Sequence, residues 1–162
     1  KNIFQKHNLN AKICKLHLNE NDQVVSSELL RKSILSLDFK FVKSCLGRNW
    51  AVTGNVQKGD QNGRKLEFAT ANLQLSKTLE PKFGVYFTRT RIMKQDGSDF
   101  ISEYMPSITN FGIRPTLDGK KKLFETHILN YENFFKNNEI YDRRIFVELL
   151  GFLREEKKYQ LF

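Results

Sequence analysis

The hydrophobic pattern of the chain changes in character near Trp50. Before that point apolar residues recur at helical spacing, with Leu30, Ile34 and Leu37 at i, i+4 and i+7. The helix that this spacing predicts begins at Ser26 or Ser27, either of which is a good N-cap residue.

A second, shorter helix is predicted over residues 39–46, ending at Gly47, and a short strand over residues 11–18. A strand followed by helices is typical of the end of an α/β domain. A piece of this size is too short to fold alone, so we expect it to depend on another part of a protein.

After Trp50 the pattern becomes a series of short apolar or alternating runs separated by turn signals. No long helix interrupts them, which favours an antiparallel sheet. Closure into a small barrel is the economical way to remove the sheet edges. Strands are predicted over residues 50–57, 71–76, 84–93, 99–113, 122–131 and 143–153.

Composition narrows the class of protein only a little. The 162 residues suffice for one domain, or for one domain and a fragment of another. The formal net charge of +9 is compatible with nucleic acid, an anionic membrane surface or nucleotides as partners. The charge is diffuse, however, and a solvated surface explains it equally well.

Two further features concern the cellular compartment. We expect no transmembrane helix and no signal peptide, because the chain lacks both a long apolar run and a cleavage site. Cys14 and Cys45 are expected to be unpaired thiols of a reduced cytoplasmic protein. The first residue is not Met, so we expect either processing or a longer parent polypeptide.

Three short segments could carry chemistry, and the first is KGDQNGRKLEFATAN, residues 58–72. Gly59 and Gly63 allow backbone amides to converge on an anion. Thr70 and Asn72 lie two residues apart and so share one face of a strand. Their oxygens could hold Mg²⁺ beside a nucleotide phosphate, or they could satisfy the backbone of a turn.

The second segment is LFETHIL, residues 123–129, in which both faces of the predicted strand carry apolar residues. A carboxylate in such a strand, here Glu125, is paired, solvated through a cleft, or functional, and it could accept a proton from an attacking hydroxyl. His127 is more simply a structural residue. The third segment, residues 109–116, contains Gly112 and Pro115, and we expect a shaped connection whose polar ends could line a pocket.

These segments occur in the order and spacing of the riboflavin kinase (flavokinase) family, which the chain resembles. The matching segments are EFATANL (67–73), GVY (84–86), NFGIRPT (110–116), ETHIL (125–129), YDRRIFV (141–147) and LREEKKY (153–159). Upstream, VSSELLR (25–31) and LGRNW (46–50) are similar to the end of the adenylyltransferase half of bacterial bifunctional FAD synthetases.

The resemblance implies a mainly β fold: a six-stranded antiparallel Greek-key barrel preceded by a short α/β remnant. Residues 1–46 would be the remnant of the adenylyltransferase domain, and residues 47–162 the kinase barrel with its C-terminal helix cut short. The implied reaction transfers the γ-phosphate of ATP to the ribityl 5′-hydroxyl of riboflavin and gives FMN, with Mg²⁺. Because the adenylyltransferase motif H-x-G-H is missing, this chain alone is not expected to make FAD.

Carried over position by position, the resemblance implies that Thr70 and Asn72 hold Mg²⁺ and the nucleotide phosphates, and that Glu125 is the general base. It further implies nucleotide or flavin contacts from Gly59, Gly63, Asn110, Thr116 and Arg154. The chain has Glu67 and Ala69 where the family has glycine and proline. Losing that proline loosens the approach to Thr70, and a carboxylate repels phosphate unless its side chain turns outward, so we expect a drifted member of the family with weak kinase activity.

Two other functions stay open at this point. One is a flavin- or nucleotide-binding module with lost or weak turnover. The other is a basic barrel that binds single-stranded RNA, which would need exposed aromatic residues with interleaved cations. YFTRTR at residues 86–91 is the stretch that hints at it. We expect small-molecule substrates, with neither nucleic acid nor membrane as a partner.

Overall fold

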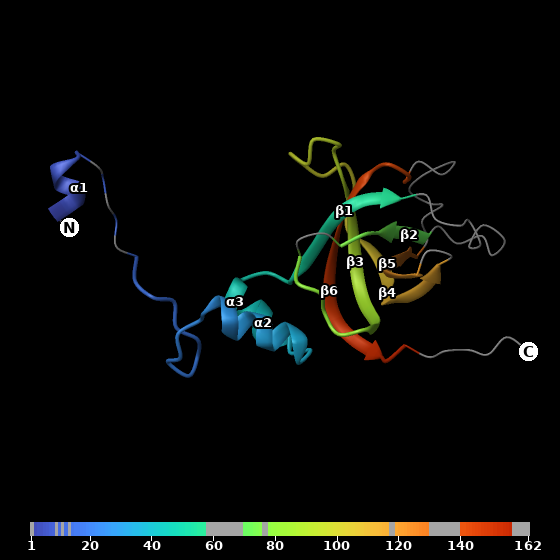
Figure 1. Ribbon diagram of the computed structural model, residues 1–162, viewed down its shortest axis with the longest axis horizontal. Coiled ribbons are helices and arrows are strands. Elements are labelled where there is room, and N and C mark those ends of the chain that lie inside the picture. The colour runs from blue at the N-terminus through green and yellow to red at the C-terminus, as the bar shows by residue number, and fades with distance from the viewer. Residues whose placement is uncertain are drawn as a thin grey trace, which may run out of the picture.

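The computed structural model describes residues 2–8, 10, 12, 14–57, 70–75, 78–116, 119–129 and 140–156 of the chain (Figure 1). Its helices are α1 (Asn2–Lys6), α2 (Ser27–Leu35) and α3 (Phe39–Leu46). Its strands are β1 (Ala51–Gln57), β2 (Thr70–Leu73), β3 (Gly84–Met93), β4 (Met105–Thr116), β5 (Gly119–Ile128) and β6 (Arg144–Arg154).

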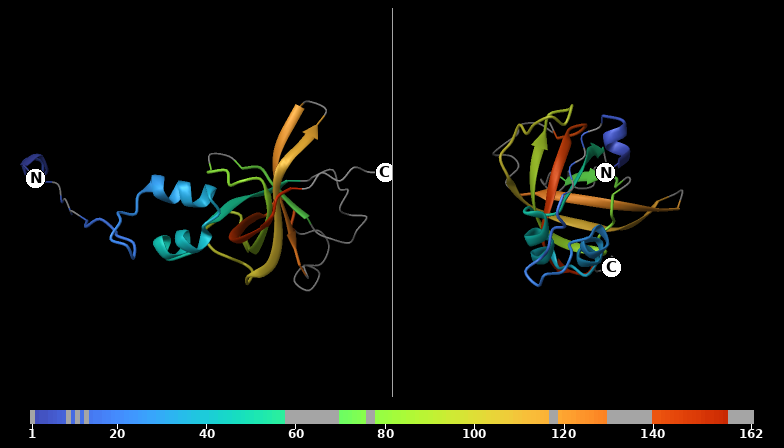
Figure 2. Two further views of the ribbon diagram at one scale, coloured as in Figure 1. Left: turned by 90° about the horizontal axis from the view of Figure 1, so that it is seen from below. Right: turned by 90° about the vertical axis from the view of Figure 1, so that its left-hand side faces the viewer.

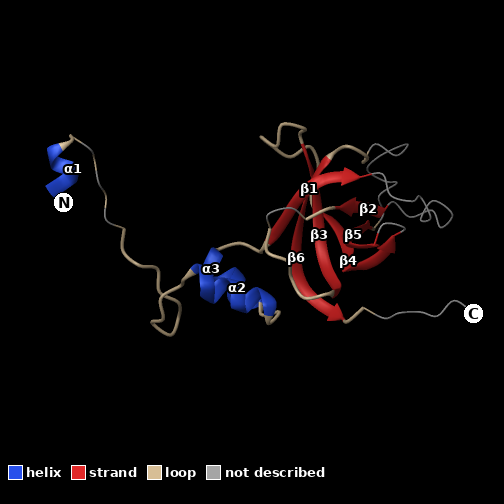
Figure 3. Cartoon of the chain, viewed as in Figure 1, coloured by secondary structure: helices blue, strands red, loops and turns tan. Residues whose placement is uncertain are grey.

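The six strands form a closed barrel in the order β1-β2-β5-β4-β3-β6, and every neighbouring pair is antiparallel. Strands β3, β4 and β5 follow one another, and β6 returns to lie beside β3, which is the Greek-key arrangement. Figure 3 shows the helices and the barrel as separate regions of the chain. The barrel predicted from sequence is confirmed.

Local capping explains both predicted helices. Ser26 accepts a hydrogen bond from the backbone N–H of Leu29 at 3.1 Å, and α2 begins at the next residue. Asp38 caps α3 in the same way through Phe41, and α3 ends at Gly47 with φ of 68°, a left-handed conformation that glycine adopts at little cost.

Helices α2 and α3 pack together over one end of the barrel (Figures 1 and 2). Phe39 of α3 is buried and meets the ring of Tyr86 edge-on, with centroids 6.0 Å apart. Tyr86 also meets Phe152 edge-on at 5.2 Å, and its hydroxyl donates to the carbonyl of Lys82. Burial raises the pKa of Tyr86 to about 12, so the hydroxyl stays protonated and can donate.

The barrel interior contains a continuous chain of hydroxyl groups as well as apolar side chains. Five fully buried residues contribute them: Thr90, Ser107, Thr88, Thr109 and Thr126, in the order of their hydrogen bonds. Successive hydroxyl oxygens lie 2.8, 2.8, 3.0 and 3.0 Å apart. Each hydroxyl can donate one bond and accept others, so the chain satisfies groups that burial would otherwise penalise.

A second polar cluster joins the barrel to the segment that precedes it. Glu148 of β6 is only 4% exposed and accepts hydrogen bonds from Asn49 at 2.8 Å, Tyr104 at 2.9 Å and Arg89 at 2.5 Å. Burial alone would raise the pKa of Glu148, but these hydrogen bonds outweigh it and hold the pKa below its ordinary value. The hydrogen bond between Arg89 and Glu148 also raises the pKa of Arg89.

Arg89 and Arg91 belong to the stretch that suggested an RNA surface. The guanidinium of Arg89 lies 3.8 Å from the ring centre of Tyr104, and that of Arg91 lies 3.9 Å from that of Phe100. Both aromatic rings come from the loop between β3 and β4. These two cations are therefore already covered by aromatic rings of the same chain.

Two sequence predictions are wrong in detail. Among the described part of residues 11–18 there is no strand: Leu16 is 72% exposed, and only Leu18 forms an isolated bridge. A strand pattern without a sheet to pair with has no partner for its backbone groups. In the described part of residues 1–46, the regular elements are thus the helices α1, α2 and α3.

The second error concerns β4. It begins at Met105 rather than at residue 99, because the Ser102 hydroxyl, instead of a ladder carbonyl, accepts from the Ile92 backbone N–H at 2.8 Å. It then continues through Gly112 and Pro115 to Thr116, so residues 109–116, which were expected to form a shaped connection, are strand throughout. The C-terminal helix was predicted to begin within residues 154–162. Arg154 instead ends β6, residues 155–156 are not helical, and residues 157–162 lie outside the described residues.

Candidate active site

One pocket gathers polar residues on the outer face of the barrel, with a volume of about 400 Å³. This size is ordinary for a small-molecule site. Val85 and Ile108 supply apolar surface. The polar residues that line it are Thr70, Asn110, Glu125, His127, Arg154 and Glu156.

Strand register explains why these residues meet. Asn72 of β2 pairs with Glu125 of β5, and Glu125 pairs with Asn110 of β4. The row continues from Asn110 to Val85 of β3. Paired residues on one face have Cβ atoms about 5 Å apart, so an amide, a carboxylate and a second amide stand side by side.

Alternation along the strands turns this row outward. Phe124 and Thr126 of β5 are fully buried in the barrel, whereas Glu125 between them is half-buried. On β4, Thr109 and Phe111 are likewise fully buried on either side of Asn110. The interior residues therefore fix the strands, and the residues between them carry the candidate chemistry.

Charged groups surround the carboxylate of Glu125. Arg114 of β4 brings its Nη1 to 3.6 Å from Glu125 Oε1, and the two side chains are 42% and 26% exposed. Glu156, just beyond β6, accepts a hydrogen bond from Asn110 Nδ2 at 3.3 Å. Arg154 lies in the same pocket. Two cations and two carboxylates thus lie close together around a cavity of small-molecule size.

The two amides of the row share an unusual feature. The Oδ1 atoms of Asn72 and Asn110 are buried and have no hydrogen-bond partner among the described residues. Buried acceptors are normally paired, and an unpaired one in a pocket indicates a place for a ligand, a cation or a water. Both amides are strand neighbours of Glu125.

The structure brings together most of the residues chosen from the sequence. Thr70, Asn110, Glu125 and Arg154 line the pocket, and Asn72 is the strand neighbour of Glu125. The backbone of Thr116 is described but its side chain is not, so its predicted contact stays a prediction. Thr116 is the last residue of β4, where β4 and β5 pair beyond the end of β2 and form a ribbon that projects from the barrel (Figure 2).

Gly59 and Gly63 lie outside the described residues, as do Glu67 and Ala69. Among the described residues, no group of three or more His, Cys, Asp or Glu side chains could hold a metal ion. In that same part of the chain, none of the helices has the length and apolar character needed to cross a membrane.

Sequence reasoning missed four residues of the pocket. His127 was taken as structural, and Val85, Ile108 and Glu156 were not singled out. The alternation of β3 and β4 puts Val85 and Ile108 on the outer face, which a strand pattern can show. That Glu156 turns back over β4 depends on a contact 46 residues away in sequence, and no local pattern reports it.

The fold and the pocket define a class of structure: a small closed Greek-key barrel with a cavity of small-molecule size on an outer sheet face. The family model described as riboflavin kinase (flavokinase) matches residues 46–162 of the chain. The chain therefore belongs to the riboflavin kinase family.

Several curated relatives are bifunctional riboflavin kinase/FMN adenylyltransferases. That of Pseudomonas fluorescens is 35% identical over 83% of this chain and 40% of its own length. That of Buchnera aphidicola subsp. Schizaphis graminum is 32% identical over 86% of this chain and 41% of its own length. That of Escherichia coli K12 is 29% identical over 83% of this chain. The chain thus spans about 40% of the relatives it matches.

A solved structure also resembles the chain over most of its length. It is described as a macrolide-efflux protein from Streptococcus pneumoniae, is 25% identical, and superposes with a TM-score of 0.71. The match covers 98% of this chain and 48% of the other. This structural similarity supports the barrel fold described above.

Proposed function

We propose that this chain is the riboflavin kinase part of a bifunctional enzyme and transfers the γ-phosphate of ATP to the ribityl 5′-hydroxyl of riboflavin, giving FMN. The observation that carries the proposal is the row Asn72–Glu125–Asn110 beside a pocket of about 400 Å³, in a chain of the riboflavin kinase family. Residues 1–46 are proposed to be the end of the adenylyltransferase half, which this chain alone does not reconstitute. A cytoplasmic location stays a prediction.

Glu125 is the proposed general base. The attacking hydroxyl must lose its proton as the new O–P bond forms, and a carboxylate in a partly buried pocket can accept it. Arg114, 3.6 Å away, restrains the carboxylate and neutralises part of its charge before the substrate arrives. Val85 and Ile108 offer apolar surface to a flavin ring, while Arg154 offers a positive charge at the pocket wall.

The proposed metal ligands are Thr70 and Asn72. Mg²⁺ prefers hard oxygen ligands, which a threonine hydroxyl and an amide oxygen are. The buried Oδ1 of Asn72, without a partner among the described residues, fits this role. When bound, Mg²⁺ would neutralise charge on the phosphates of ATP.

The test is FMN formation from riboflavin, ATP and Mg²⁺, separated by chromatography. Glu125→Gln keeps the shape of the side chain and removes the base, so we expect a loss of at least ~100-fold in turnover. Glu28→Gln is the matched control: Glu28 lies on α2, is 74% exposed and pairs only with Lys32 among the described residues. It should leave turnover unchanged.

The outcome separates the main proposal from its alternative. Product formation that Glu125→Gln abolishes supports the kinase. Equal FMN formation by wild type and Glu125→Gln contradicts the role of Glu125. Saturable quenching of flavin fluorescence without any product would instead identify a binding module that has lost turnover.

A further inference from the structure

Asn110 lies between two carboxylates. Glu125 is its strand neighbour on β5, and its Nδ2 donates to Oε1 of Glu156 at 3.3 Å. An ionised carboxylate can only accept hydrogen bonds, so the nitrogen end of the amide must face Glu156. The oxygen takes the other end, where it is buried and has no partner among the described residues.

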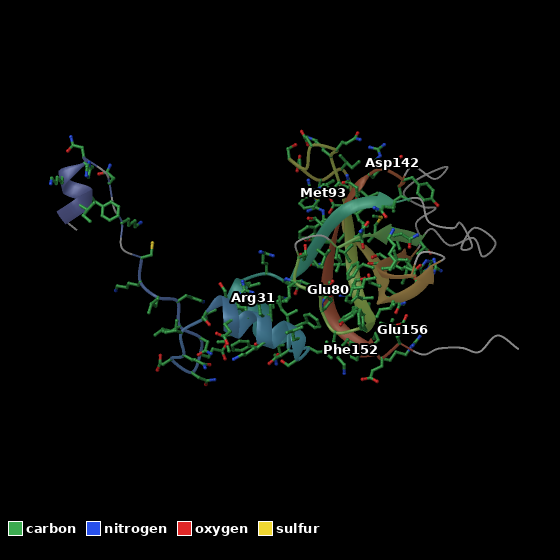
Figure 4. The ribbon with its side chains drawn as sticks, viewed as in Figure 1. Arg31, Glu80, Met93, Asp142, Phe152 and Glu156 are labelled. Carbon is green, nitrogen blue, oxygen red and sulfur yellow. The ribbon has the colours of Figure 1, made fainter. Side chains whose placement is uncertain are left out.

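Gly112 shows that the chain reserves room for Glu156. Gly112 lies two residues after Asn110, on the same face of β4. A Cβ at this position would lie 2.2 Å from Glu156 Oε1, so the end of the Glu156 side chain would have to shift away. The absence of a side chain at Gly112 thus leaves space for the carboxylate in the position where it meets Asn110. Figure 4 shows the Glu156 side chain just beyond the end of β6.

We infer that Asn110 Oδ1 accepts a hydrogen bond from a hydroxyl of the acceptor substrate's polyol chain, and that Glu156 is the positioning residue that fixes the amide for it. The inference rests on the proposed function and deepens it. A hydroxyl can donate to an amide oxygen that no residue satisfies, next to the carboxylate that takes the reacting proton. The pocket thereby selects a flavin by its hydroxylated chain as well as by its ring.

The experiment compares riboflavin with lumiflavin, which has the same ring system without the polyol chain. Each is titrated into the full chain, and binding is followed by quenching of flavin fluorescence. Asn110→Leu keeps the shape of the side chain and removes the acceptor, so the Kd for riboflavin should rise about tenfold. Glu156→Gln should raise it about threefold, since a neutral amide no longer dictates how Asn110 is oriented. Neither should change the Kd for lumiflavin.

Glu155→Gln is the matched control for charge and position. Glu155 is the adjacent residue, pairs with Lys82 at 2.9 Å and does not line the pocket. It should leave both flavin affinities unchanged. Thermal unfolding of every variant shows whether a lost affinity reflects a lost fold.

A double-mutant cycle tests the positioning role directly. Gly112→Ala should displace Glu156 and raise the riboflavin Kd about as much as Glu156→Gln does, but it should change nothing when Glu156 is already alanine. Riboflavin affinity of Asn110→Leu within twofold of wild type, or an equal loss for lumiflavin, overturns the inference. If wild type makes FMN while these variants bind normally, only this inference fails; if wild type neither binds riboflavin nor makes FMN, the proposed function fails with it.

Discussion

Thr109→Val is the sharpest test of how the barrel interior holds the site in place. Thr109 is fully buried, and its hydroxyl lies 3.0 Å from that of Thr88 and 3.0 Å from that of Thr126. Valine has nearly the same shape, so the substitution removes both hydrogen bonds with little change in packing. Thr88 keeps its bond to Ser107, whereas Thr126 is left buried without a side-chain partner among the described residues.

The magnitude follows from this asymmetry. Thr109→Val removes two hydrogen bonds, and one of these losses leaves the buried hydroxyl of Thr126 without a side-chain partner, so the free energy of unfolding should fall by about 2–3 kcal/mol. Thr126→Val removes one bond at the end of the chain of hydroxyls and should cost about 1 kcal/mol. In the double variant Thr109→Val/Thr126→Val, no buried hydroxyl is left without a partner. Its cost should therefore be only about 1–2 kcal/mol, less than the sum of the two single costs.

Urea unfolding followed by circular dichroism measures these costs. Thr53→Val is the control, because Thr53 is exposed on β1, and its cost should stay within about 0.5 kcal/mol. Additivity of the two buried substitutions within about 0.5 kcal/mol would show that the hydroxyls do not act as a connected chain. A cost for Thr109→Val no larger than that for Thr53→Val would refute the reasoning altogether.

Two further predictions concern stability. The pKa of Glu148 is lowered in the folded state, so its contribution to stability is complete above the ordinary pKa of 4.5 and is lost as the pH falls below that value. Glu148→Gln should lower the free energy of unfolding at pH 7 by about 2 kcal/mol and flatten the loss of stability below pH 4.5. Parallel pH profiles of wild type and variant in urea unfolding would contradict this. Gly84 has φ of 148°, and a Cβ there would lie 2.6 Å from the Arg154 carbonyl oxygen, so Gly84→Ala should lower the free energy of unfolding by about 3 kcal/mol. Gly151→Ala is the control: a Cβ at Gly151 would have nothing within 4 Å, so the cost should be less than about 0.5 kcal/mol. Equal melting temperatures for the two glycine variants would contradict the steric argument.

Local sequence signals predicted the elements whose causes are local. β3 spans Gly84–Met93, the residues that alternation indicates, and Ser26 and Gly47 delimit the helices as capping predicts. The strand expected at residues 11–18 failed because a strand depends on a partner, and the described residues supply none. A pattern of side chains cannot report whether such a partner is present.

The site shows the same division. Thr70 and Asn72, or Glu125 and His127, share a strand face by simple alternation, and the sequence predicts that much. That Asn72 and Asn110 flank Glu125 depends on the pairing of β2 with β5 and of β5 with β4, between segments far apart along the chain. Gly112 was misread as part of a shaped connection, and the carboxylate that lies against it, that of Glu156, comes from beyond the end of β6.

The same pairing register of β4 with β5 places the hydroxyl groups inside the barrel and the row Asn72–Glu125–Asn110 on its outer face. Thr109 pairs with Thr126, and the next pair along the same strands is Asn110 with Glu125. A slip of one residue between β4 and β5 would turn buried threonines outward and carry the pocket residues into the core. The hydroxyl bond between Thr109 and Thr126 opposes that slip, because it forms only in this register. The buried polar chain therefore stabilises the barrel and, through the alternation of the strands, places the amide beside the carboxylate on which the proposed chemistry depends.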